Sequence, residues 1–255
     1  EYNLLNYAVF VSFFPQLIAG PIVHHQEMMP QFANLKNKLI NYKNIVFGLF
    51  IFCVGFFKKA VIADTFSVWA SKGFDNGYNL NLFEAWVTSL SYTFQLYFDF
   101  SGYADMAIGA ALLFNIKIPV NFNSPYKALD IQDFWRRWHI TLSRFLRDYV
   151  YFSLGGNRNG DLRAYVNVLM TFLIAGLWHG ASWMFVLWGG LHGSALIVHR
   201  AWRQAGLELN KVFSWFITFN FVNLTWVFFR AKDFADAVRV LKGMVGLGGI
   251  ALPHF

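Results

Sequence analysis

Charged side chains are scarce in this sequence. Asp, Glu, Lys and Arg together make up 14% of the chain, whereas they make up about 25% of a typical soluble domain. With hydrophobic residues at 56%, the composition excludes a disordered chain and a nucleic-acid-binding module, which both need a high density of charge. The net charge of +7 is instead expected in loops that flank membrane helices.

Cysteine and the common motifs of soluble enzymes are also nearly missing. Cys53 is the only cysteine in the sequence, so an internal disulfide is excluded, and its place in an apolar run favours a small buried side chain. There is no HExxH, GxSxG, P-loop or GxGxxG motif, which excludes the usual signatures of soluble hydrolases and nucleotide-binding proteins. His192 and His199 share a helix face without a third ligand, so no metal site is predicted.

Long apolar runs take the place of these features. Residues 2–26, 164–198 and 212–229 contain no Asp, Glu, Lys or Arg, and a helix needs about 20 apolar residues to cross a bilayer. Aromatic residues make up 20% of the chain, more than one globular core needs, and membrane interfaces accommodate them. The sequence therefore predicts an all-α fold, a polytopic transmembrane helical bundle.

Five apolar segments have the composition of membrane helices: 4–19, 44–63, 82–116, 164–198 and 212–229. As continuous helices, the third and the fourth would exceed the roughly 30 Å of the hydrocarbon core. We expect the third to break at Ser101 and Gly102, and the fourth at one of its glycines. Lys58 and Lys59 are expected to extend from the end of the second helix toward the lipid headgroups.

Two amphipathic segments accompany the apolar runs. Residues 117–163 carry the largest basic excess between spans, which places them in the cytoplasm by the positive-inside rule. Within them, apolar residues recur at helical spacing over 131–152, which predicts an amphipathic helix in the membrane interface or in a protein-lined cavity. A second one is expected over 234–244. Two i,i+4 ion pairs are expected on the first, Asp133 with Arg137 and Arg144 with Asp148.

His179 is the foremost candidate for chemistry. It lies near the middle of the run 164–198, between Trp178, which can form one wall of a site, and Gly180, which lets a substrate approach the backbone. A neutral imidazole costs less to bury than a carboxylate, and its ordinary pKa of about 6.5 suits a general base. The alternative is a histidine that hydrogen-bonds to a neighbouring helix and only stabilises packing.

His139 is a second candidate, together with two neighbouring cations. It lies on the apolar side of the segment 131–152 and so faces an interface, close to Arg136 and Arg137. The two arginines could bind the phosphates of a donor such as coenzyme A. Alternatively, they are interfacial cations that extend toward the headgroups.

Asp99 is a third candidate, at or near membrane depth. Gln95, Asp99 and Asp105 are spaced so that they could form a polar seam between two helices. Polar side chains in membrane segments are costly and often functional. A role of Asp99 in binding substrate and a role in fixing the packing of broken helices are therefore both open.

Several of these residues fall in motifs that resemble the membrane-bound O-acyltransferase (MBOAT) family, and its alginate O-acetyltransferase branch in particular. The motifs are FFPQLIAGP at 13–21, YFDFSGYADM at 97–106, DFWRRWH at 133–139, WHGA at 178–181 and WVFFR at 226–230. The resemblance implies helices that enclose a tunnel, open to an acyl donor on the cytoplasmic side and to an acceptor on the other. It also implies that His179 is the essential catalytic histidine and that His139 occupies the family's second histidine position.

The resemblance leads to a specific functional expectation. Residues 1–255 form one transmembrane domain that lacks the family's N-terminal helices, in a multi-pass protein of the cell inner membrane. No cofactor is bound, and acetyl passes from acetyl-CoA or another acyl thioester toward hydroxyls of an exported polysaccharide or to a periplasmic acyl-accepting protein. Two alternatives are D-alanyl transfer to teichoic acid and, from a different class, a transporter or channel that uses intramembrane Asp and His residues.

Overall fold

The computed structural model describes residues 3–17 and 20–251, and over these residues the fold is all-α, as predicted. The longer helices are α1 Leu4–Ser12, α2 His25–Ala33, α3 Tyr42–Phe57, α4 Asp64–Asp75, α5 Leu82–Leu113, α6 Ile131–Arg137, α7 Ile140–Phe145, α8 Asp161–His179, α9 Trp183–Gln204, α10 Lys211–Arg230 and α11 Phe234–Met244. Short 3-10 turns lie at η1 Phe14–Gln16, η2 Leu35–Lys38 and η4 Pro125–Lys127, and π-helical turns at η3 Lys58–Ala63 and η5 Leu146–Tyr151.

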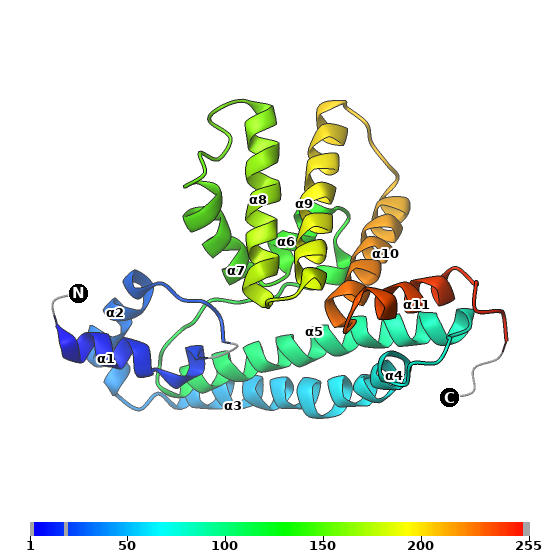
Figure 1. The fold of residues 1–255 in the computed structure, drawn as a ribbon. Helices are drawn as coiled ribbons and strands as arrows, with labels where there is room; N and C mark the ends of the chain where they lie inside the picture. Colours follow the sequence, from blue (N-terminus) through cyan, green and yellow to red (C-terminus); the bar gives the residue numbers. More distant parts are fainter. Residues whose placement is uncertain (1–2, 18–19, 252–255) are drawn as a thin grey trace.

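The helices form two groups that cross each other (Figure 1). The lower layer consists of α3, η3, α4 and α5, which pack along one another. The upright bundle consists of α8, α9 and α10, which stand across the lower layer with α6 and α7 beside them. Helix α11, the amphipathic helix expected over 234–244, lies against α5 and joins the two groups.

Three helical segments are long and apolar enough to cross a membrane: Tyr42–Asp75, Asp161–His179 and Lys211–Arg230. The last two confirm the spans expected at 164–198, up to its break, and at 212–229. The fourth predicted segment does break at a glycine, because α8 ends at His179 and α9 begins after Ser182, whose side chain accepts a hydrogen bond from the Met184 N–H. The expected single helix over 4–19 is wrong: α1 ends at Ser12, and Pro15 lies in a separate 3-10 turn. Residues 18 and 19 lie outside the described residues.

The break expected at Ser101 and Gly102 is also wrong, because α5 runs without interruption through both residues. Gly102 instead allows two backbones to touch: a Cβ atom there would lie 2.7 Å from the carbonyl oxygen of Gly55 on α3. Gly48 and Gly109 repeat the contact, since a Cβ atom on Gly48 would lie 2.7 Å from the Gly109 carbonyl. Small residues at such positions let membrane helices approach closely. These glycines therefore mark a helix contact.

The prediction that Lys58 and Lys59 extend from a helix end is wrong, because the helical segment continues through η3 and α4 to Asp75. The Lys58 Nζ lies 2.6 Å from Asp105 Oδ2, and the Lys59 Nζ lies 2.6 Å from Asp99 Oδ1. Both aspartates belong to α5, Asp99 about one helical turn before Gly102 and Asp105 about one turn after it. The π-helical turn at η3 places both lysines toward α5, so the ion pairs connect the two long helices of the lower layer.

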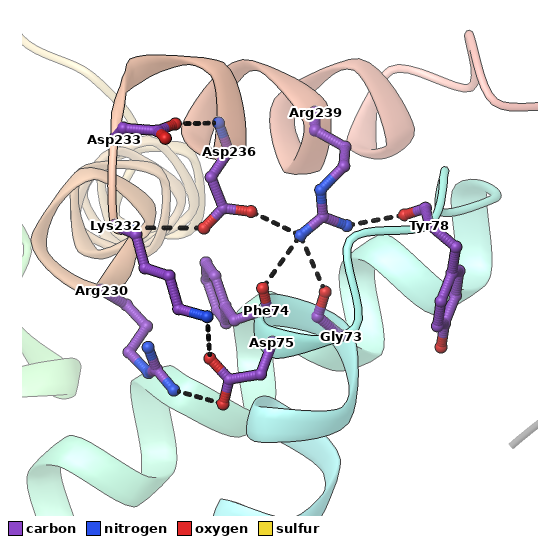
Figure 2. A network of polar contacts seen from close by, with 9 residues as sticks. All are labelled: Gly73, Phe74, Asp75, Tyr78, Arg230, Lys232, Asp233, Asp236 and Arg239. Carbon is purple, nitrogen blue, oxygen red and sulfur yellow. Dashed lines mark hydrogen bonds and ion pairs between the residues drawn. The ribbon is translucent and has the colours of Figure 1, made fainter.

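A polar cluster holds α11 against the far end of the lower layer (Figure 2). The Arg239 guanidinium donates to the backbone carbonyls of Gly73 and Phe74, at the C-terminal end of α4 where carbonyls lack helical partners, and to the carbonyl of Tyr78 in the loop that follows. The Asp236 carboxylate, three residues earlier on α11, forms an ion pair with the same guanidinium. The cluster fixes the C-terminal helix of the described chain onto α4.

Candidate active site

His179 is the last residue of α8, at the turn into α9. Its imidazole is surrounded by aromatic rings, with centroid distances of 5.0 Å to Trp178, 5.2 Å to Trp188, 5.1 Å to Phe229 and 6.4 Å to Phe185. These rings come from α8, α9 and α10, so the site exists only when the upright bundle is assembled. The imidazole of His179, which is partly exposed, forms no hydrogen bond with any residue that the structure describes.

His192 shows what a histidine that only stabilises packing looks like in the same protein. Its side chain is fully buried, Trp135 Nε1 donates to its Nδ1 at 3.2 Å, and its Nε2 lies 3.0 Å from Thr225 Oγ1. Both ring nitrogens are therefore occupied. The contrast with His179 favours chemistry at His179, because a histidine retained for packing would be expected to have polar partners.

His139 lies where the predicted amphipathic helix over 131–152 is broken, so the expectation of one helix is wrong. Three short pieces, α6, α7 and η5, replace it, and His139 separates the first two with φ of 43° and ψ of 53°. This left-handed conformation is costly for a residue with a side chain and is concentrated at functional sites. Because of the break, His139 is buried against the ring of Phe100, with centroids 4.8 Å apart, rather than at an interface.

The structure brings the two candidate histidines to the same region. His139 and His179 are 40 residues apart in the sequence. Trp138, next to His139, lies 5.0 Å from Trp226 between ring centroids, Trp226 lies 5.7 Å from Trp188, and Trp188 lies 5.2 Å from the His179 imidazole. Trp188 on α9, which contacts the His179 ring, also contacts Trp135 on α6, with ring centroids 5.8 Å apart. No group of three or more His, Cys, Asp or Glu side chains among residues 3–17 and 20–251 is placed to hold a metal ion.

Asn121, in the loop that joins α5 to α6, is a site residue that the sequence alone does not reveal. It is fully buried, and its Oδ1 lies 3.2 Å from His139 Nδ1. The same oxygen accepts from the backbone N–H and the hydroxyl of Thr141, at 3.2 Å and 2.9 Å. Its position among polar and proline residues in a loop gives no periodic signal, and only the tertiary fold brings it to His139.

Beside this region lies a cavity of about 780 Å³ between α6, α7, η5, α8 and α9, with several arginines around it. We call it the arginine cavity. The arginines that line it are Arg136, Arg144, Arg147, Arg200 and Arg203, and His199 also lines it. Its apolar lining includes Trp135, which also contacts the ring of His192. Trp135 therefore forms a direct connection between the cavity and the buried aromatic cluster.

The arginines of the cavity differ in how far their charge is already neutralised. Arg144 pairs with Glu27 at 2.7 Å, so the expected Arg144 to Asp148 pair is wrong, and Asp148 pairs with Arg147 instead. Arg136 and Arg203 form no ion pair with a residue that the structure describes. Their guanidinium groups are thus free to bind an anion.

Arg137 and Asp99, two further predicted site residues, have protein partners. Arg137 Nε lies 2.9 Å from each carboxylate oxygen of Asp133, which confirms the predicted i,i+4 pair. Arg137 does not line the arginine cavity. Asp99 binds Lys59, and Asp105 binds Lys58, across the contact between α5 and η3. Both aspartates thus lie on a polar seam between two helices, as predicted.

Comparison with known proteins shows which family this chain resembles. The membrane-bound O-acyltransferase family model matches residues 1–232. The chain is 63% identical to a peptidoglycan O-acetyltransferase of Helicobacter pylori, over 99% of this chain and 49% of that protein. It is 43% identical to a probable alginate O-acetylase of Pseudomonas aeruginosa, over 97% of this chain and 47% of that protein. A teichoic acid D-alanyltransferase of Streptococcus thermophilus is 28% identical, over 90% of this chain.

These matches extend over nearly all of the chain, although the chain spans about half the length of the curated acetylating relatives that it matches. The family model covers all five motifs that the sequence shares with this group, including those that carry His139 and His179. With its all-α fold and apolar helices, the chain therefore belongs to the membrane-bound O-acyltransferase family.

Proposed function

We propose that the protein of which this chain is part transfers acetyl groups from a cytoplasmic thioester to hydroxyls of an exported glycan, and that His179 is its catalytic base. The observation that supports this most is the contrast among the histidines. His192 has both ring nitrogens bonded, whereas His179 has no hydrogen bond within the described residues and is surrounded by aromatic rings. Such a group is free to exchange a proton with a substrate.

The proposed reaction needs a single base, which takes one proton from the acceptor and returns it to the leaving group. The acceptor hydroxyl oxygen attacks the thioester carbonyl carbon while His179 takes the hydroxyl proton. The carbon–sulfur bond then breaks, the ester is released, and the imidazolium returns its proton to the departing thiolate. Trp178, Trp188 and Phe229 would exclude water around the imidazole, which limits hydrolysis of the thioester.

For the donor, we propose that the arginine cavity binds the phosphates of acetyl-CoA or of a related acyl thioester. Arg136 and Arg203 are the residues with uncommitted charge, and guanidinium groups bind phosphate oxygens in a bidentate manner. The apolar lining of Trp135, Ile140 and Phe172 suits the less polar parts of such a donor. Arg137 contributes indirectly, because its bond to Asp133 stabilises α6, which carries Arg136.

For the acceptor, the names of the relatives support a glycan. One relative at 63% identity is named for peptidoglycan and several at 42% to 43% are named for alginate, so we place an acetylated cell-envelope glycan ahead of alginate itself. The teichoic acid D-alanyltransferases are similar at 28% and 25% identity, which makes D-alanyl transfer the second candidate. We further propose a multi-pass position in the inner membrane, with a periplasmic acyl-accepting protein as a possible intermediate carrier.

The test uses the full-length protein in its own membranes. Ester-linked acetyl on the exported glycan is compared between wild type and His179→Ala, at equal amounts of inserted protein. Loss of esters without loss of protein supports the proposal, and unchanged esters overturn the role of His179. Supplying the donor with a label on its acyl group separates the remaining candidates: labelled acetyl on glycan supports acetylation, labelled D-alanine supports the second candidate, and movement of a solute without a covalent label indicates a transporter.

A further inference from the structure

Asn121 is bound in a way that fixes its orientation completely. Its Oδ1 accepts the backbone N–H of Thr141 at 3.2 Å and the Thr141 hydroxyl at 2.9 Å. The Thr141 hydroxyl in turn accepts the backbone N–H of Ile22 at 3.0 Å, so its own hydrogen is available for Asn121. A backbone N–H can only donate, and the atom that accepts it must be the amide oxygen. The side-chain amide therefore cannot be turned around.

This orientation determines which nitrogen of His139 carries the proton. The Asn121 Oδ1 lies 3.2 Å from His139 Nδ1 and can only accept. His139 must therefore donate its Nδ1–H to Asn121, and the lone pair of the neutral ring is on Nε2. No hydrogen bond occupies Nε2 among the residues described, and the adjacent Trp138 connects His139 to the His179 region through the rings of Trp226 and Trp188.

We propose that Asn121 is a positioning residue that holds His139 in the tautomer with a basic Nε2, so that His139 can serve proton transfer next to His179. This inference rests on the proposed function. Backbone hydrogen bonds connect the loop to the break in the helix: the Ile140 N–H donates to the backbone carbonyl of Asn121 at 3.0 Å, and the Asn123 N–H donates to the backbone carbonyl of Arg137 at 2.9 Å. These bonds stabilise the left-handed conformation of His139.

A purely structural role explains the arrangement less well. The Asn121 Nδ2 is buried and has no hydrogen-bond partner among the described residues, and an unsatisfied buried donor is unfavourable. The φ of 43° at His139 adds a further cost. The strained backbone is the feature that points to chemistry, because such conformations are concentrated at functional sites. The unmet N–H does not distinguish the site by itself, since the buried Asn223 has one as well.

The chain contains a matched control for Asn121. Asn223, on α10, is also fully buried, and its Oδ1 accepts the hydroxyls of Ser89 at 3.0 Å and Thr93 at 2.7 Å. Its Nδ2 also lacks a partner among the described residues. In both asparagines the side chain is buried, the amide oxygen accepts from two non-histidine donors, and the amide NH2 group has no partner among the described residues. Asn121 differs in that its oxygen is also hydrogen-bonded to a histidine. A comparison of the two separates a loss of stability from a loss of histidine positioning.

The experiment uses the full-length protein reconstituted in lipid vesicles with acetyl-CoA and a soluble glycan acceptor, and measures kcat, KM and the pH profile per folded molecule. Asn121→Leu is expected to lower kcat by about ten- to a hundredfold with little change in KM for the donor. Asn223→Leu is expected to lower the amount of folded protein without lowering kcat. Thr141→Val, which removes one of the two donors to Asn121, should lower kcat less, and Thr141→Ser should restore it.

The pH profile provides a readout that a structural role would not change. In Asn121→Asp, a carboxylate faces the Nδ1–H and stabilises the protonated imidazole, so the neutral base forms only at higher pH. The acidic limb of the kcat profile is then expected to move up by about one to two pH units. An unchanged profile, together with equal losses for Asn121→Leu and Asn223→Leu, would overturn the inference. If instead wild-type protein transfers no acetyl, or His179→Ala retains full activity, the proposed function fails and not the role of Asn121 alone.

Discussion

Polar groups lie among apolar helices in two regions of this protein, and the two regions treat them differently. In the lower layer, each lysine of η3 has an aspartate partner on α5, at 2.6 Å in both pairs. In the upright bundle, His192 has two partners, whereas His179 has none among the described residues. The lower layer therefore uses polar groups in closed pairs to connect helices. In the upright bundle, His179 is a titratable group left open, without a hydrogen-bond partner among the described residues, which is why we propose it as the residue that takes part in the reaction.

The largest expected effect concerns the open group. His179→Ala should lower acetyl transfer by about a hundred- to ten-thousandfold, because a general base contributes about that much, while the protein inserts and folds as before. The measurement is initial rate per folded molecule with labelled donor. Little loss of rate, or a loss explained by a lower amount of folded protein, would remove the distinction between the two regions.

The second effect concerns a closed pair. Lys58→Met or Asp105→Leu alone leaves one partly buried charge without its partner between η3 and α5, so we expect about 2–3 kcal/mol of destabilisation, less than for a fully buried pair. The double variant removes both charges and should recover most of that loss. The measurement is thermal unfolding in detergent. Equal destabilisation in the single and double variants would show that the pair does more than balance charge.

The third effect tests His192 as a packing residue. His192→Ala removes two hydrogen bonds and leaves a cavity next to Trp135 and Trp226, and should destabilise the fold by about 2–3 kcal/mol. The rate per folded molecule should fall much less than in His179→Ala. A rate loss equal to that of His179→Ala, in protein that is still folded, would place His192 in the reaction.

The smallest effect concerns the arginine cavity. Arg136→Ala should raise KM for acetyl-CoA by about tenfold, since one uncommitted guanidinium contact to phosphate is lost, and should leave kcat nearly unchanged. Arg158 is an exposed arginine outside the cavity, so Arg158→Ala is the matched control, with an expected KM equal to that of wild type. A rise in KM that is the same for both variants would point to general surface charge rather than a site.

The sequence was informative where one residue type has one structural meaning. The uncharged runs 164–198 and 212–229 predicted membrane helices, and Gly180, one of the glycines expected to break the first of them, lies at the turn between α8 and α9. Gly102 misled, because a glycine in an apolar run serves equally as a break or as a contact, and only the position of Gly55 on α3 decides between them. The same ambiguity applies to Lys58 and Lys59, whose partners lie on a different helix.

The sequence named the two histidines as candidates, but it did not predict what surrounds them. His179 and His139 are visible because imidazoles are rare in apolar segments and because the motifs resemble those of a known family. The break at His139 could not be predicted, since the apolar spacing continues through it and the left-handed backbone depends on the loop that contains Asn121. Asn121 itself acquires its meaning only through contacts with residues later in the chain.

The glycine contacts between α3 and α5 have a mechanical consequence. At Gly48 with Gly109 and at Gly55 with Gly102 the two backbones touch with no side chain between them. Sliding or rotating one helix against the other would therefore drive main-chain atoms into each other at both places. The lower layer is therefore expected to be rigid, whereas the short, interrupted pieces from α6 to η5 are joined by turns and are better suited to local motion.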